Sequence, residues 1–141
     1  MVILVIILAV LAFLAIQNTH QDPRLVQLKS MYRTFLSKLP EKYNSIKHKN
    51  TIISGRKKTG IVGENVNKGE EITVCLDGGD INSMFHILIH EIAHSSVQEY
   101  DHSGEFWRNY KELTDIAVQH GLYTPGIDKA YCGQRIQDGF T

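Results

Sequence analysis

The sequence has little cysteine and no excess of charge of either sign. Its 141 residues include 15 basic and 15 acidic side chains, so the formal net charge is zero. That balance argues against a general polyanion binder, and no clear nucleic-acid-binding region stands out. The two cysteines, Cys75 and Cys132, make no disulfide framework and lack the CxxC spacing of a structural zinc site. We expect two small buried residues, with a single bridge as the alternative.

The first sixteen residues contain no polar side chain. A helix of that length spans about 24 Å, slightly short of a bilayer core of about 30 Å. A secretory signal is less favoured, because no basic residue precedes Arg24 and Phe13 spoils the best small-residue cleavage site. We therefore predict an uncleaved transmembrane helix over residues 1–17 of a single-pass membrane protein. The positive-inside rule places the rest on the cytoplasmic side, because three basic residues follow: Arg24, Lys29 and Arg33.

The remaining residues, 22–141, are predicted to form one small α+β domain. Asp22-Pro23 marks the start of a helix that Pro40 ends. Short strands are predicted at residues 51–54, 60–63 and 71–76, separated by glycine-containing turns. Two helices follow: one begins near a cap at Asp80 or Asn82, and the other runs from about residue 105 to 120. The tail, 122–141, is expected to be mostly loop.

Residues 87–94 contain the pattern His-Glu-x-x-His within an apolar helical run. His90 and His94 lie one turn apart on the same helix face, so both imidazoles can point at one metal ion. Glu91 lies about 100° further round and can take a proton from water without being a ligand. Burying these three polar side chains without partners would be costly, and a bound metal ion would satisfy them. The pattern therefore predicts a Zn²⁺ site with Glu91 as general base.

A catalytic zinc ion usually has three protein ligands and one open position. His102 is the favoured third ligand, because the turn-forming residues before it can return the chain to the first helix. Four other downstream side chains remain alternatives: Glu99, Asp101, Glu105 and His120. The metzincin pattern is excluded, because its glycine and histidine positions hold Val97 and Tyr100.

Two further side chains near the motif have more than one interpretation. His86 lies one turn before His90, but three histidines on one straight helix cannot all close on one tetrahedral ion. We interpret His86 as a packing or supporting residue. Tyr131 is a candidate for stabilising an oxyanion, and simple packing is the alternative.

The run His-Glu-Ile-Ala-His at residues 90–94, followed by His-Ser-Gly-Glu-Phe-Trp at residues 102–107, resembles the SprT-like/WLM group of gluzincin-like zinc metallopeptidases. Tyr-Cys-Gly at residues 131–133 also resembles the tail of small membrane-anchored members from large DNA viruses. The resemblance covers roughly residues 82–133. It implies a zincin-like fold, Zn²⁺ on His90, His94 and His102, Glu91 as general base, and a protein or peptide substrate. It brings no DNA-binding region with it.

Two other classes of function stay open at this point. A zinc ion could hold the two helices together in a structural module without turnover, which a fourth protein ligand would reveal. Alternatively, the chain could be a membrane-tethered interaction protein whose histidines bind nothing.

Overall fold

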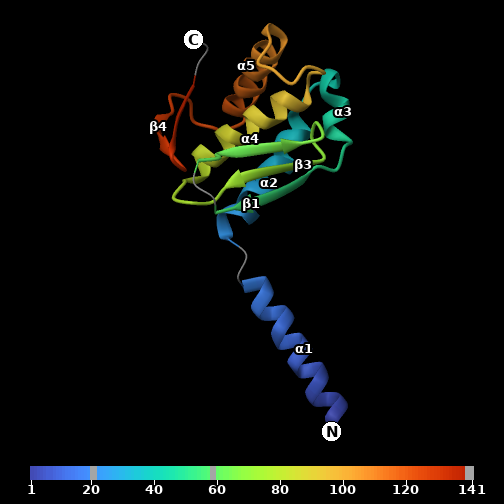
Figure 1. Ribbon diagram of the computed structural model, residues 1–141. Coiled ribbons are helices and arrows are strands. Elements are labelled where there is room, and N and C mark those ends of the chain that lie inside the picture. The colour runs from blue at the N-terminus through green and yellow to red at the C-terminus, as the bar shows by residue number, and fades with distance from the viewer. Residues whose placement is uncertain (20–21, 58–59, 139–141) are drawn as a thin grey trace.

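The computed structural model describes residues 1–19, 22–57 and 60–138, with only the backbone of residues 16–19 (Figure 1). Residues 22–57 and 60–138 together form one folded body, and residues 1–19 form a separate helix. The elements are α1 (Val2–Thr19), α2 (Pro23–Lys38), η1 (Glu41–Tyr43), α3 (Asn44–Lys47), β1 (Ile52–Arg56), β2 (Gly63–Val66), β3 (Glu71–Cys75), α4 (Ile81–Ser95), α5 (Gly104–Gln119), β4 (Asp128–Tyr131) and β5 (Gln134–Gln137).

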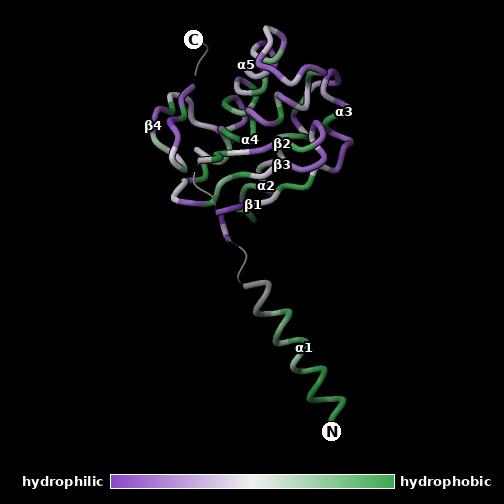
Figure 2. The backbone as a smooth tube through the Cα atoms, in the orientation of Figure 1, coloured by the Kyte–Doolittle hydropathy of each residue, from purple (hydrophilic) through white to green (hydrophobic). Residues whose placement is uncertain are grey.

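Helix α1 is directed away from the rest of the chain and is apolar along most of its length (Figure 2). The prediction of a transmembrane helix over residues 1–17 is wrong, and so is the single-pass topology with a cytoplasmic domain that depended on it. Among the described residues, no helix combines the length and the apolar character needed to cross a bilayer. The physical reason is length, because an apolar run of sixteen residues covers about 24 Å of a core of about 30 Å.

A three-stranded sheet lies beside the helices, in the order β1-β3-β2. The central strand, β3, pairs in parallel with β1 and antiparallel with β2, so β1 and β2 are both edges. The predicted α+β class with a short sheet is confirmed. The predicted strand at residues 60–63 is displaced, since pairing begins at Gly63 and continues through Glu64 and Asn65. An edge strand with one solvated face needs few apolar residues, which weakens its signal in the sequence.

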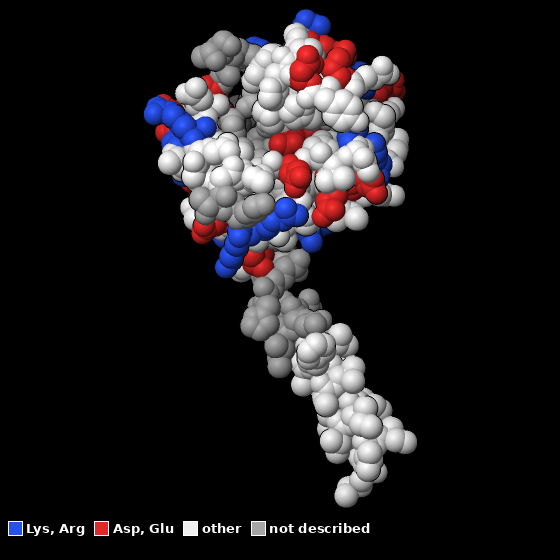
Figure 3. All heavy atoms as spheres, viewed as in Figure 1, with Lys and Arg blue, Asp and Glu red and all other residues white. Residues whose placement is uncertain are grey.

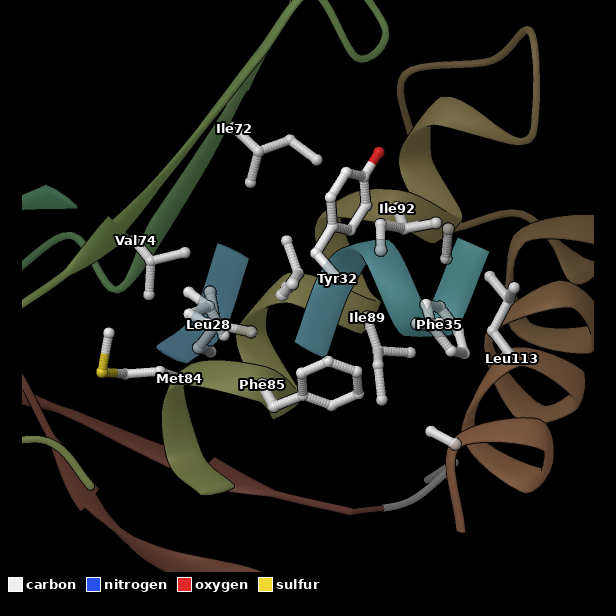
Figure 4. Close-up of a cluster of buried hydrophobic side chains, with 14 of the residues drawn as sticks. Leu28, Tyr32, Phe35, Ile72, Val74, Met84, Phe85, Ile89, Ile92 and Leu113 are labelled. Atoms are coloured by element: carbon white, nitrogen blue, oxygen red, sulfur yellow. The ribbon is translucent and has the colours of Figure 1, made fainter. Parts of the chain in front are cut away.

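The core lies between the sheet, α2, α4 and α5 (Figure 4). Helix α4 is buried on most of its surface, and Phe85 meets Phe35 of α2 edge to face at 5.6 Å. The fully or almost fully buried side chains of the sheet and these three helices include Leu28, Phe35, Ile72, Val74, Met84, Phe85, Leu88, Ile89, Ile92 and Leu113. Burial of side chains of this size stabilises the fold by about 1.5–3 kcal/mol each and fixes α4 against the sheet.

Each long helix of the body begins at a residue that caps it. The side chain of Asp22 accepts from the Arg24 amide at 2.9 Å, as the Asp-Pro pair predicts. Asp80 accepts from the Ser83 amide at 2.7 Å, so Asp80 rather than Asn82 is the cap of α4. The Ser103 hydroxyl accepts from the Phe106 amide at 3.2 Å and caps α5, so His102 lies directly before the cap residue of that helix.

The tail is more ordered than the sequence predicts. Strands β4 and β5 form an antiparallel hairpin where we expected mostly loop. A disulfide joins Cys132, in the turn of this hairpin, to Cys75 at the end of β3. The preferred interpretation as two separate buried cysteines is therefore wrong, and the alternative of a single bridge is confirmed. The bridge anchors the hairpin beside the start of α4, a long-range contact that local sequence patterns do not reveal.

Candidate metal centre

Three histidines meet at one point, two from α4 and one from the loop before α5. The ligand nitrogens of His90, His94 and His102 all lie within 4.8 Å of one another. The Nε2 atoms of His90 and His102 are 3.2 Å apart. Tetrahedral zinc with Zn–N bonds near 2.0–2.1 Å places its nitrogen ligands roughly 3.3 Å apart. The cluster therefore has the donor type that a tetrahedral zinc ion requires, and the His90–His102 pair is close to the required spacing.

The surroundings of the two helix histidines favour neutral imidazole, the form that binds a metal. Burial, together with the neighbouring His94 and His102, lowers the pKa of His90 to about 3. Burial also lowers the pKa of His94 to about 4, with His102 and then Lys68 adding to the effect. Both side chains therefore offer a free nitrogen lone pair at neutral pH.

An aromatic layer from α5 supports the three imidazoles. The ring of Phe106 lies 5.2 Å from His90, 4.5 Å from His94 and 4.8 Å from His102, measured between ring centroids. Trp107 stacks at a tilt against His102 at 5.6 Å. The Phe-Trp pair that follows His102 in the sequence thus restricts the rotation of the imidazoles by ring contacts.

Glu91 lies beside the cluster, almost entirely buried, and at the meeting of two clefts. One cleft of about 410 Å³ is lined by His86, His90 and Glu91 on one wall and by β5 on the other. A second of about 230 Å³ reaches Glu91 and His94 from the β2 side. Burial raises the pKa of Glu91 to about 7, with Glu64 adding to the effect. Figure 3 shows the hollow over α4 and the sheet edge, with acidic atoms inside it.

The edge strand β2 approaches α4 closely at Gly63. A Cβ atom there would lie 2.3 Å from Cγ2 of Ile87 and 3.4 Å from a carboxylate oxygen of Glu91. Any side chain would therefore displace the strand or the helix residues next to it. Glycine at this position lets the edge of the sheet form one rim of both clefts.

His86 has partners of another kind. Its Nδ1 atom lies 3.1 Å from the hydroxyl of Tyr123, 3.3 Å from that of Tyr110 and 3.3 Å from a carboxylate oxygen of Asp138. Burial lowers its pKa, and Asp138 opposes that change. The prediction that His86 supports or packs, rather than binds the metal, agrees with this network. The sequence offered no signal for Tyr123 or Asp138, which come from the tail.

The other predicted candidates lie elsewhere in the structure. The Tyr131 hydroxyl donates to the carbonyl of Cys75 and is buried, so it packs the hairpin rather than facing the histidines. His120 is the exposed C-cap residue of α5. Glu105 borders a separate groove near Tyr43. None of these, nor Glu99 or Asp101, belongs to the histidine cluster found among the described residues.

Comparison with known proteins finds relatives that match only part of the chain. No protein-family model matches the chain. It is 42% identical over 55 residues to an uncharacterized protein of Invertebrate iridescent virus 6, covering 38% of this chain and 31% of that protein. It is 32% identical over 83 residues to an uncharacterized protein of Acanthamoeba polyphaga mimivirus, covering 52% and 42%. The chain thus spans less than half the length of these viral relatives, and the viral part of the resemblance is consistent with them.

Among solved structures, the chain is similar to Wss1 from Saccharomyces cerevisiae, with a TM-score of 0.43 and 22% identity. The likeness covers 61% of this chain and 88% of that one. A likeness at this level assigns no activity. The geometry of the histidine cluster and of Glu91 is therefore the basis for inferring a function.

Proposed function

We propose that the chain is a zinc-dependent metallopeptidase of the SprT-like/WLM type, with His90, His94 and His102 as metal ligands and Glu91 as general base. One observation carries the proposal: three imidazoles converge beside a buried carboxylate that faces two clefts. When bound, Zn²⁺ would polarise a scissile carbonyl and lower the pKa of a water molecule. All of these groups lie in the predicted domain, residues 22–141, of which residues 58–59 and 139–141 lie outside the described part.

Glu91 has the properties expected of a general base in such a reaction. Its pKa of about 7 lies near neutral pH, where a base accepts and returns protons most effectively. Burial prevents bulk water from solvating the carboxylate, and the two clefts provide access for a substrate. Glu91 would take the proton from the attacking water and pass it to the leaving amine.

The edge strand β2 offers a place for an extended peptide. It has one side paired with β3 and the other unpaired within the sheet. Strand edges bind peptides through main-chain hydrogen bonds, which require no particular side-chain sequence. Because β2 borders both clefts at Gly63, a chain laid along it would pass Glu91.

The non-catalytic zinc module is the second candidate. A structural zinc site is usually closed by four protein ligands. In the part of the chain that the structure describes, the cluster contains three ligating side chains, which favours the catalytic interpretation.

The test is Glu91→Gln, assayed with dye-quenched casein after loading with zinc. Glutamine preserves the shape of the side chain but cannot accept the proton, so we expect peptidase activity to fall by at least about a hundredfold. Zinc content should remain one per chain in both proteins, measured by elemental analysis. Turnover that survives in the variant would reject Glu91 as the base. Zinc binding without turnover in the unaltered protein, across several unfolded protein substrates, would favour the structural module.

A further inference from the structure

The turn between β2 and β3 lies against the C-terminal end of α4. It consists of residues 67–70, with Asn67, Lys68 and Gly69 all at positive φ, and the Glu70 amide closes it onto the Val66 carbonyl at 3.0 Å. This tight backbone leaves the side chain of Lys68 pointing at α4 and the loop that follows it. We call residues 65–70 the β2–β3 turn segment.

Lys68 joins two parts of the metal-binding region that are separate in the sequence. Its ammonium donates to the His94 carbonyl at 3.0 Å and also to the Glu99 carbonyl. It lies 4.4 Å from the centre of the Tyr100 ring. The His94 carbonyl is one of the last of α4, where carbonyls lack partners within the helix and attract positive charge. Lys68 therefore connects the end of the ligand helix to the loop that carries His102.

Asn65 anchors the same segment on α4. Its amide nitrogen donates to the Glu91 carbonyl and to the Ser95 hydroxyl, both at 2.7 Å, while its amide oxygen accepts from the Gly69 amide at 2.7 Å. Gly69 fits so closely that a Cβ atom would lie 2.8 Å from the Ser95 hydroxyl. The segment thus has a fixed position relative to the helix, and this fixes the position from which the Lys68 side chain extends.

We propose that Lys68 is a positioning residue that holds the loop at residues 98–101 so that His102 reaches the metal. The inference depends on the proposed metal site and deepens it. His102 is exposed and comes from a loop, so its place relative to His90 and His94 has to be fixed from outside the helix. Phe106 and Trp107 support its ring, and Lys68 supports the backbone that leads to it. Because β2 also borders the clefts, a substrate strand on β2 would contact the same segment.

The test is Lys68→Met in the full chain, with zinc affinity measured by competition with a chelating fluorophore. Methionine keeps the length and apolar stem but removes the charged donor, so we expect zinc affinity to fall about tenfold. Lys49→Met is the matched control, because the Lys49 ammonium donates to the carbonyls of Asn67 and Lys68 in the same turn. That variant should bind zinc like the unaltered protein.

A second measurement separates positioning of His102 from general stabilisation of α4. In a His102→Ala background, Lys68→Met should change zinc affinity by less than about twofold, since the ligand that Lys68 positions is gone. An equal loss in both backgrounds, or no loss in the single variant, would overturn the proposal.

Amide hydrogen exchange in the metal-free protein provides a readout that does not need zinc. Lys68→Met should speed exchange at residues 97–102 by about tenfold and leave the core of α4 unchanged. If the unaltered protein binds no zinc, the proposed function fails, yet this measurement still decides whether Lys68 holds the loop. Unchanged exchange would show that it does not.

Discussion

His86, His90 and His94 follow at four-residue intervals on the same helix, yet the two ends of α4 give them different surroundings. At the N-terminal end, His86 meets two tyrosine hydroxyls and the Asp138 carboxylate, which satisfy its ring by hydrogen bonding. At the C-terminal end, His90 and His94 meet the imidazole of His102, and each of the three rings offers one nitrogen to a metal ion. Equal spacing along a helix therefore does not give equal roles, because the element that packs opposite each residue supplies its partners.

The two ends also depend on different parts of the chain. The partners of His86 come from α5 and from the tail around the β4–β5 hairpin. The partners of His90 and His94 come from the loop before α5, which Lys68 joins to the sheet. The His86 end of α4 is thus a hydrogen-bonded structural contact, and the His90 and His94 end is a candidate metal site. A substitution at one end should leave the other end intact.

The largest expected effect comes from removing one histidine at each end. His94→Ala should lower zinc affinity by roughly a thousandfold, if each ligand contributes about a third of a binding free energy of ~12 kcal/mol. His86→Ala should leave zinc affinity within about threefold but lower the free energy of unfolding by about 1–3 kcal/mol, because the hydroxyls of two buried tyrosines and a half-buried carboxylate lose a partner. Chelator competition and urea denaturation measure the two quantities. If both variants lost zinc equally, the division of α4 into two functional ends would be incorrect.

The next effect concerns the disulfide that anchors the tail. Replacing Cys75 and Cys132 together by alanine should lower the free energy of unfolding by roughly 2–4 kcal/mol, since the bridge closes a loop with a sequence separation of 57. Zinc affinity should change little, because the bridge lies at the His86 end. Denaturation without added reductant, followed by chelator competition, checks both statements. Loss of zinc in this variant would mean that the hairpin also supports the metal end.

The sequence predicted the convergence of His90, His94 and His102 better than it predicted the surroundings of His86. His90, Glu91 and His94 lie within one helical turn, so local periodicity is enough to place them on one face. The return of His102 toward α4 also followed from the turn-forming residues before it. By contrast, the partners of His86 lie up to 52 residues away, and no local pattern links Asp138 to α4. The β4–β5 hairpin and the disulfide were mispredicted for the same reason, because contacts between distant segments determine them.

The smallest expected effect tests the N-terminal cap of α4. The side-chain hydrogen bond from Lys129 and the amide of Ser83 lower the pKa of Asp80 from 3.8 to about 2. A lowered carboxyl pKa contributes stability above the unfolded value and loses it as the pH falls through the folded value. Asp80→Asn keeps a good cap but removes this dependence, so the variant should lose less stability than the unaltered protein between about pH 4 and pH 2.

The difference should be below about 1 kcal/mol, because half of the Asp80 side chain is exposed and solvent screens its pairing with Lys129. Urea denaturation of both proteins over this pH range measures it, and added salt should reduce it further. Two parallel pH profiles would show that the Lys129–Asp80 pair contributes nothing, and the N-terminal end of α4 would then be held by the cap and the His86 network alone. Zinc affinity at neutral pH should be the same in both proteins, since Asp80 lies at the opposite end of the helix from His94.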